Sequence, residues 1–426
     1  MSCTNAMQKL LRRSEIAALA AALLVLGATR SIFQQDLPRA TPETVGVSSQ
    51  RLQRIGEAIQ RHIVERHIAG AVSLVARKGF VVHYEAHGVK DIDSKKPMTR
   101  DTIFKTASST KPVTGVAIMM LVEEGKIHLA DPVSRFIPEF KEMKVAVQKE
   151  GSSEVQLVKA EREITIRDLL THGSGLLSGG PGTARAPKEL LRPSQPEETL
   201  ARYIPRLAAI PLDFQPGTKW RYSGLAGIDT LSRIVEVASG QSYDEFLRKR
   251  IFEPLGMNDT FLVVPDDREE RVATIYRSTD KGLEKNPLQL RFPKTYFSGA
   301  GGLSSTAANY FRFGQMPLNR GALDGKQLLS PRSVVIYASN QVGDLFEGQS
   351  GRPKGMGFGF TVEVVQDSIA AGTFRSDGSF GWDGAFGTHF WVDPEQQLVA
   401  VLMIQTSVGR QIHRDFETAV MQAIVE

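Results

Sequence analysis

A serine and a lysine stand three residues apart, Ser108 and Lys111, in the segment TASSTKPVTG, residues 106–115. On a helix, residues i and i+3 share a face, so the lysine amine can reach the serine hydroxyl. A serine hydroxyl is a weak nucleophile until a base accepts its proton, and lysine serves as that base only where burial or nearby cations favour its neutral form. The apolar residues that follow, PVTGVAIMM, provide such a setting. The pattern therefore predicts a serine nucleophile with its activating base one helical turn further along the chain.

The spacing alone is not specific, because the chain repeats it elsewhere. Ser278 and Lys281 in RSTDKG have the same separation, but that segment is polar and turn-like. A polar helix start on the surface is the alternative interpretation of residues 108–111. The apolar neighbourhood favours Ser108 and Lys111 over the second pair, without deciding the matter.

Two further segments carry groups that fit serine chemistry. In PGTKWRYSG, residues 216–224, Tyr222 stands between a Pro-Gly turn and a predicted helix, where its hydroxyl could bond a nucleophile or relay a proton. In GSFGWDGAFGTHFWVDP, residues 378–394, glycines interrupt an aromatic strand, and backbone N–H groups there could stabilise an oxyanion. The alternatives are a tyrosine that only packs and a bulged strand filled by aromatic rings.

Other enzyme classes are less well supported. No serine lies in a G-x-S-x-G motif, so the nucleophile elbow of an α/β-hydrolase is not supported. A Ser-His-Asp triad stays open, although His172 and His389, the histidines nearest glycine-rich segments, fit structural roles better. The HExxH, GxxxxGK[ST] and GxGxxG motifs are missing from the sequence. We therefore expect neither a metal nor an organic cofactor in the reaction.

Composition and charge narrow the class of protein further. With 41% hydrophobic residues and a net charge of +5, the 426-residue chain gives no reason to expect a nucleic-acid partner. Cys3 is the only cysteine, so no disulfide can form within the chain. Residues 1–29 combine three basic residues with the apolar run IAALAAALLVLGA and are expected to be a signal peptide. We expect an exported protein, periplasmic or secreted; the alternative is a cytoplasmic protein. No later segment is apolar and long enough for a transmembrane helix.

Hydrophobic periodicity and glycine positions predict helices and strands along the rest of the chain. Residues 30–46 are expected to be a linker. Helices are predicted from Ser49 and within 111–127, 164–176, 224–240, 242–256 and 410–425, and strands within 69–79, 80–89, 357–365, 384–393 and 397–406. Strands from both chain ends then form one antiparallel sheet. The expected organisation is an α/β domain of residues 47–105 and 291–426, with a mostly helical domain of residues 106–290 inserted.

Taken in order, these segments resemble the serine β-lactamase and penicillin-binding-protein superfamily, in particular the family VIII carboxylesterases related to class C β-lactamases. The S-x-x-K element is characteristic of that superfamily. The resemblance covers residues 45–420 and includes FKTASSTKPVTGVAIMMLVEEGKIHLADPVSRFIPEF, ITIRDLLTHGSGL, PGTKWRYSG, IFEPLGM and GAGGLSSTAANYFRFGQMPLN. It implies a β-lactamase/transpeptidase-like fold of the α+β type, with a helical domain inserted into an antiparallel sheet flanked by helices.

The resemblance also implies roles for individual residues. Ser108 would be the acylated nucleophile, Lys111 its activator and Tyr222 the partner in proton transfer. The third element of the family falls on Trp382-Asp383-Gly384. The oxyanion hole would then consist of the backbone N–H groups of Ser108 and Ala385.

Two departures from the family pattern bear on the substrate. Gly224 stands where β-lactamases carry the asparagine of Tyr-x-Asn, and Trp382 and Asp383 stand where they carry Lys-Thr or His-Thr. Trp382 lacks the cation that would meet a substrate carboxylate, and an ionised Asp383 would repel one. These changes favour a carboxylesterase that acts on neutral small-molecule esters. A β-lactamase or D-amino-acid peptidase is the alternative among enzymes, and a non-catalytic penicillin-recognising homologue is the alternative outside them.

Overall fold

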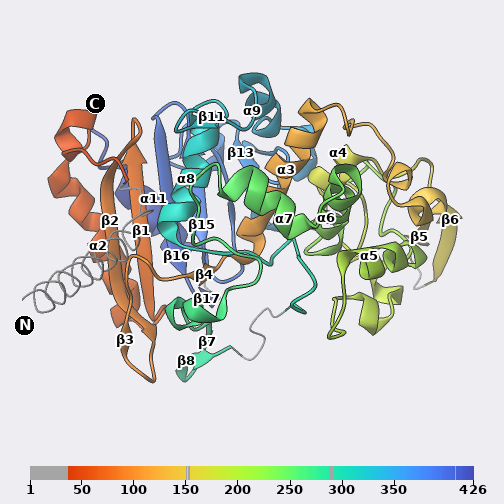
Figure 1. The fold of residues 1–426 in the computed structure, drawn as a ribbon, viewed down its shortest axis with the longest axis horizontal. Coiled ribbons are helices and arrows are strands. Elements are labelled where there is room, and N and C mark those ends of the chain that lie inside the picture. The colour runs from red at the N-terminus through yellow and green to blue at the C-terminus, as the bar shows by residue number, and fades with distance from the viewer. Residues whose placement is uncertain (1–36, 150, 152–153, 287–291, 408) are drawn as a thin grey trace, which may run out of the picture. The chain divides into compact units, whose positions relative to one another are not determined.

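An eight-stranded antiparallel sheet forms the centre of the unit from Arg39 to Glu426 (Figure 1). Its strands stand in the order β12-β13-β14-β15-β16-β1-β2-β3. The computed structural model describes residues 37–149, 151, 154–286, 292–407 and 409–426. The signal peptide predicted for residues 1–29 lies outside them and stays a prediction. The strands of the sheet are β1 (Gly70–Arg77), β2 (Phe80–Asp91), β3 (Lys96–Pro97), β12 (Met356–Phe358), β13 (Glu363–Val365), β14 (Phe380–Asp383), β15 (His389–Asp393) and β16 (Leu398–Ile404).

The two ends of the chain meet in the middle of this sheet. Strand β1 pairs with β16 over seven residue pairs, from Ala71 opposite Ile404 to Arg77 opposite Leu398. Every residue of both strands is buried, as expected for strands covered on both faces. The antiparallel sheet predicted from both chain ends is therefore confirmed, and the strands predicted within 69–79 and 80–89 pair as the hairpin β1–β2.

Helices cover both faces of the sheet, and β15 shows how neighbouring residues separate the two layers. Trp391 packs against Phe416 of α11, whereas Phe390 packs against Tyr310 of α8. Consecutive residues of a strand point to opposite faces, so α11 and α8 lie on opposite sides. Helix α2 contacts β1, β2 and α11 (Figure 1). The helices are α2 (Ser49–Val64), α3 (Lys111–Glu123), α4 (Ile166–Leu170), α5 (Leu200–Tyr203), α6 (Ala226–Ser239), α7 (Tyr243–Leu247), α8 (Ala307–Leu318), α9 (Pro331–Tyr337), α10 (Ser368–Ala371) and α11 (Gln411–Met421).

Residues 106–290 contain helices α3 to α7 and also two hairpins that the sequence analysis did not predict. These hairpins are β5–β6 (Lys144–Gln148, Val155–Lys159) and β7–β8 (Tyr276–Thr279, Gly282–Lys285). The remaining short strands are β4 (Phe104–Lys105), β9 (Ser304–Ser305), β10 (Ala322–Leu323), β11 (Lys326–Gln327) and β17 (Thr406–Ser407). Among the described residues, no helix has the length and apolar character needed to cross a membrane.

One predicted strand was wrong. Residues 357–365 were expected to form a single strand, but they contain the paired strands β12 and β13. The chain reverses between them, where the Gly359 N–H bonds the Val362 carbonyl at 2.8 Å and Thr361 adopts a φ of 67°. The two residues at the tip of this turn, Phe360 and Thr361, are typical of strands, so the composition alone does not reveal it. Residues 42–45 of the predicted linker form a short 3₁₀ helix, Pro42–Val45.

Candidate active site

Ser108 lies in the 3₁₀ turn Ala107–Thr110, which runs directly into α3 at Lys111. The serine therefore precedes the α-helix rather than belonging to it. In 3₁₀ geometry the side chains of residues i and i+3 eclipse each other, which directs the Lys111 side chain at Ser108. The Nζ–Oγ distance is 3.2 Å. Ala107 has a φ of 45°, a conformation that costs energy for a residue with a side chain and marks the sharp entry into this turn.

Lys111 is completely buried, because α3 is packed on all sides. Its Nζ is 2.8 Å from the carbonyl oxygen of Gly224 and 2.7 Å from that of Ala300. The amine is thus held by two backbone acceptors from distant segments, and its third neighbour is the Ser108 hydroxyl. Gly224 was expected to contact the substrate, and in the structure its carbonyl oxygen accepts the hydrogen bond from Lys111. No atom lies within 4 Å of the position that a Cβ of Gly224 would occupy.

Tyr222 completes the group around the serine hydroxyl. Its Oη donates to Ser108 Oγ at 2.7 Å. The ring is held by His172, with centroids 4.7 Å apart, and by Trp382 at 5.7 Å. The structure therefore brings Ser108, Lys111 and Tyr222 together, although 114 residues separate the tyrosine from the serine.

Asp229 of α6 is a site residue that the sequence analysis missed. It is fully buried and accepts hydrogen bonds from the Ala300 N–H at 2.9 Å, from the Ser298 hydroxyl at 2.8 Å and from the Tyr296 hydroxyl at 2.9 Å. Burial raises the pKa of Asp229 to about 6 in spite of these bonds. The carboxylate fixes the loop whose Ala300 carbonyl holds Lys111. The sequence did contain one indication of this role: Asp229 is an acidic residue among the apolar positions of the helix predicted within 224–240.

His172 is not placed to act as the base of a triad. Its Nδ1 accepts the Ser223 N–H at 3.3 Å, and its ring packs on Tyr222. Burial, and then the charge of Lys111, hold the pKa of His172 well below its ordinary value. A neutral, buried imidazole in this place positions Tyr222, in keeping with the structural role expected for this histidine.

Trp382 and Asp383, adjacent on β14, have different surroundings. Trp382 contacts the ring of Tyr222, but the Asp383 carboxylate is 2.6 Å from His389 Nδ1 and 3.8 Å from His413 Nδ1 of α11. Burial alone would raise the pKa of Asp383, but the two imidazoles hold it well below its usual range. The expectation that Asp383 repels a substrate carboxylate is corrected here, because strand alternation turns its side chain toward α11 and its charge is already compensated.

The turn after β14 lies close to the serine. A Cβ at Gly384 would collide with the Thr106 carbonyl and the Thr388 hydroxyl, so only glycine allows this approach. Ala385, the other expected contributor to the oxyanion hole, follows directly in the chain. The close backbone approach that the glycines predicted is present at this turn.

The sequence analysis also did not identify Arg352, a cation that lies near Trp382. The guanidinium carbon of Arg352 lies 5.3 Å from the centre of the Trp382 ring. Arg352 also pairs with Glu363, with N and O 2.9 Å apart, and Glu363 pairs with Arg375 at 3.0 Å as well, so two guanidinium groups share one carboxylate. Sequence reasoning could not find it, because Arg352 belongs to none of the motifs.

A helix-flanked antiparallel sheet and a half-buried serine in contact with a buried lysine and a tyrosine together define a protein of the serine-hydrolase type. The chain belongs to the β-lactamase family, whose model matches residues 53–422. The predicted resemblance to the serine β-lactamase and penicillin-binding-protein superfamily is thereby confirmed, and so is the fold class.

Individual proteins similar to this chain include esterases. The chain is 36% identical over 353 residues to Protein Rv1367c of Mycobacterium tuberculosis (strain ATCC 25618 / H37Rv), a match that covers 79% of this chain and 86% of that protein. It is 31% identical over 382 residues to esterase EstB of Burkholderia gladioli, covering 83% and 90%. The structure is similar to that of EstCE1, a hydrolase with promiscuous acyltransferase activity, with a TM-score of 0.73, 28% identity and coverage of 87% and 99%.

Proposed function

We propose that this protein hydrolyses carboxylic esters of small molecules through an acyl-enzyme on Ser108, as the family VIII carboxylesterases do. The observation that carries the proposal is the contact of one serine hydroxyl with both a buried lysine amine, at 3.2 Å, and a tyrosine hydroxyl, at 2.7 Å. The similarity to EstB and EstCE1, which are named as an esterase and a hydrolase, supports ester substrates.

The hydrogen bonds of Lys111 fit the role of proton acceptor. A neutral lysine amine has two N–H donors and one lone pair, whereas the ammonium has three donors and no lone pair. The carbonyls of Gly224 and Ala300 accept two N–H groups, and the remaining position points at Ser108. As an ammonium the group donates its third N–H to Ser108 Oγ, and as a neutral amine it directs its lone pair at the hydroxyl proton instead.

The reaction follows from this arrangement. As Ser108 Oγ attacks the ester carbonyl, its proton passes to the Lys111–Tyr222 pair, and a C–O bond forms. The negative charge on the carbonyl oxygen is stabilised by the backbone N–H groups of Ser108 and Ala385. The bond to the alcohol then breaks, and the leaving alkoxide receives the proton from the same pair. Water repeats these steps on the acyl-enzyme and releases the acid.

The surroundings of the serine favour a neutral substrate. Trp382 places an aromatic ring where carboxylate-binding relatives carry lysine, and Gly224 offers no side-chain amide. Phe358 lies against the same tryptophan, with ring centroids 5.3 Å apart. Arg352 above Trp382 is the observation that favours the second candidate, a β-lactamase or D-amino-acid peptidase. That candidate is the weaker one, because the strand itself carries Trp382 in place of the lysine and Gly224 replaces the asparagine.

The test compares turnover of a short-chain p-nitrophenyl ester with turnover of a chromogenic cephalosporin. We expect strong ester hydrolysis and weak cephalosporin cleavage, both lost in Ser108→Ala. Ser278→Ala is the matched control, because Ser278 is exposed on β7 and has a lysine at the same spacing. Mass-detected labelling of Ser108 by a fluorophosphonate separates an enzyme from a non-catalytic homologue. Ester turnover that survives Ser108→Ala in a folded variant would contradict the proposal.

A further inference from the structure

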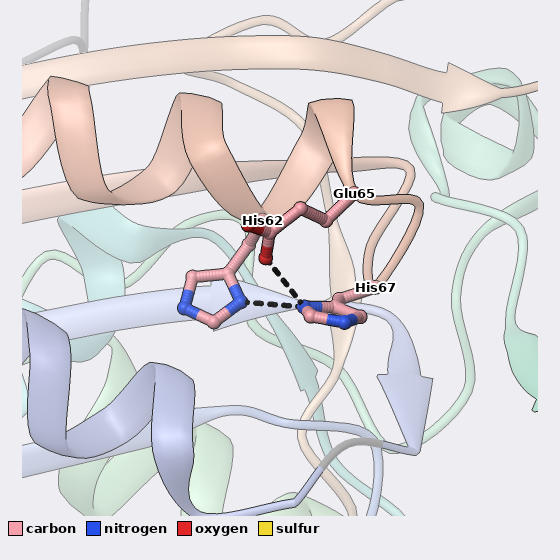
Figure 2. A group of neighbouring side chains, drawn as sticks. All are labelled: His62, Glu65 and His67. Carbon is pink, nitrogen blue, oxygen red and sulfur yellow. Dashed lines mark hydrogen bonds and ion pairs between the residues drawn. The ribbon is translucent and has the colours of Figure 1, made fainter.

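Three potential metal ligands lie together where α2 ends (Figure 2). His62 is in the last turn of α2, Glu65 is its C-cap and His67 follows two residues later. His62 Nδ1 is 3.0 Å from His67 Nδ1, and His67 Nδ1 is 3.4 Å from Glu65 Oε2. No two of the three ligand atoms are more than 4.8 Å apart.

The way the helix ends brings His67 back over His62. Arg66 adopts a left-handed conformation, with a φ of 57°, at a position where glycine is usual. The N–H of Arg66 bonds the Ile63 carbonyl at 3.0 Å, and the N–H of His67 bonds the His62 carbonyl at 2.9 Å. This is the Schellman pattern, which closes the helix tightly. The two imidazoles are therefore held close together by the backbone.

The separations of the ligand atoms match those around a tetrahedral ion. Zinc binds imidazole nitrogen and carboxylate oxygen at about 2.0–2.2 Å, which places neighbouring ligand atoms about 3.3–3.5 Å apart. The measured separations of 3.0 and 3.4 Å are close to this value before any ion is present. The third pair, His62 and Glu65, is also within 4.8 Å, so all three groups are close enough to bind one ion.

A carboxylate already orients His62 for binding. His62 Nε2 is 3.0 Å from Asp415 Oδ2 of α11, and Asp415 is itself held by Gln411 at 2.7 Å and by Arg61 at 3.2 Å. Asp415 Oδ2 can accept only a proton from His62 Nε2, and in that tautomer His62 Nδ1 carries no proton and can coordinate an ion. Carboxylate support of a metal-ligating histidine is a general feature of zinc sites.

We propose that His62, Glu65 and His67 bind one divalent ion of the zinc type, with water in the fourth position. Two imidazoles and one carboxylate suit zinc and neighbouring transition ions, whereas magnesium and calcium prefer all-oxygen sites. The negative end of the α2 dipole favours a cation here. The side chain of His62 is only 5% exposed, but those of Glu65 and His67 are about half exposed, so an ion has direct access from solvent. The ion would fasten the end of α2 to α11 through His62 and Asp415, with no part in the ester chemistry.

A second group of possible ligands, Asp383, His389 and His413, is less suited to a cation. His389 Nδ1 is already bonded to Asp383 at 2.6 Å. The cavity of about 370 Å³ beside it is also lined by Arg352 and Arg375, whose charges repel a metal ion. The end of α2 is therefore the better candidate.

The test uses the full-length protein without a histidine tag, stripped by a chelator and then titrated with zinc. Calorimetry and metal analysis give the stoichiometry and the dissociation constant, and thermal unfolding gives the stabilisation. Glu65→Gln and His67→Ala change exposed side chains and should leave the fold intact, unlike a change of the buried His62. His128→Ala removes another exposed histidine and is the matched control.

We expect the wild type and His128→Ala to bind zinc at this site and to unfold at a higher temperature with zinc than without. Glu65→Gln and His67→Ala should each bind one zinc fewer per chain, or bind it at least about tenfold more weakly, and lose the zinc-dependent rise. Wild-type protein that takes up no zinc would overturn the proposal. Equal zinc binding and equal stabilisation in all four proteins would overturn it as well, because the ion would then lie elsewhere.

Discussion

Tyr222→Phe is the sharpest test of the proposed proton transfer, because it removes one oxygen atom and leaves the ring. The ring keeps its contacts with His172 and Trp382, whose centroids lie 4.7 and 5.7 Å away. The structural loss is one partly buried hydrogen bond to Ser108, worth about 0.5–1.5 kcal/mol of stability. The folded structure should therefore survive with a slightly lower melting temperature.

The expected loss of activity is much larger than the loss of stability. Tyr222 Oη is 2.7 Å from the nucleophilic oxygen, the distance at which it can pass a proton during bond formation and bond cleavage. A positioned acid–base group contributes about 10²–10⁴-fold to the rate. At 1.36 kcal/mol for each factor of ten, this is about 2.7–5.4 kcal/mol in the barrier. The loss should appear mainly in kcat, because the hydroxyl is not expected to bind the ground-state ester.

The assay is kcat/KM for a short-chain p-nitrophenyl ester, measured together with thermal unfolding. Tyr203→Phe is the matched control: the Tyr203 hydroxyl also donates one hydrogen bond at 2.7 Å, to the Leu190 carbonyl, and it is buried. The control should lose stability to a similar extent and keep its activity. If Tyr222→Phe stays within about threefold of the wild type, Tyr222 is not an acid–base group and the reasoning is refuted.

Four further predictions concern the same site and its surroundings. Lys111→Arg should fail almost as badly as Lys111→Ala in the ester assay, because arginine stays protonated and cannot accept a proton; an active arginine variant would show that charge alone suffices. Asp229→Asn should lower kcat/KM at least about tenfold, because an amide cannot accept all the bonds that fix the adjoining loop; wild-type kinetics would argue against this positioning role. Although burial lowers it, neighbouring carboxylates raise the pKa of His389 from 6.5 to about 9. Because its pKa is higher in the folded state, protonated His389 stabilises the fold fully below pH 6.5, and this stabilisation is lost as the pH rises through 9. The melting temperature of the wild type should therefore fall between these pH values, and that of His389→Gln should fall less. Trp382→Lys should raise the ratio of cephalosporin to ester kcat/KM by at least roughly tenfold, since one well-placed charge contact is worth on the order of 1–3 kcal/mol; an unchanged ratio in a folded variant would place the specificity elsewhere.

Contacts between residues close in the sequence, and single helices and strands, were predictable because they depend on neighbouring residues alone. Ser108 and Lys111 are three residues apart, so any helical turn brings them together, and the apolar run after them indicates a buried helix. The segments of β1 and β16 are short runs rich in apolar residues, and this composition predicted that both are strands. The resemblance to a known family then ordered these parts into one architecture.

The sequence analysis did not take into account that adjacent residues of a strand, such as Trp382 and Asp383 on β14, point to opposite faces of the sheet. Trp382 and Asp383 were expected to act together on the substrate. In the structure Trp382 contacts Tyr222, while Asp383 is bonded to His389. The direction of a side chain on β14 depends on the register with β15, and that register is a property of the assembled sheet.

The sequence by itself predicted Ser108 and Lys111 as a pair in contact, the order of the main elements and, through its resemblance, the family. The resemblance implied Tyr222 as a partner of the serine, but only the tertiary structure decided the contacts themselves. These are the Tyr222 hydroxyl on Ser108, the Gly224 and Ala300 carbonyls on Lys111, and Asp229 behind them. These groups are more than one hundred residues away in the chain from Ser108 or Lys111. No local sequence pattern predicts a contact over such a separation. The contact forms only when the helices and strands between the two residues have packed together.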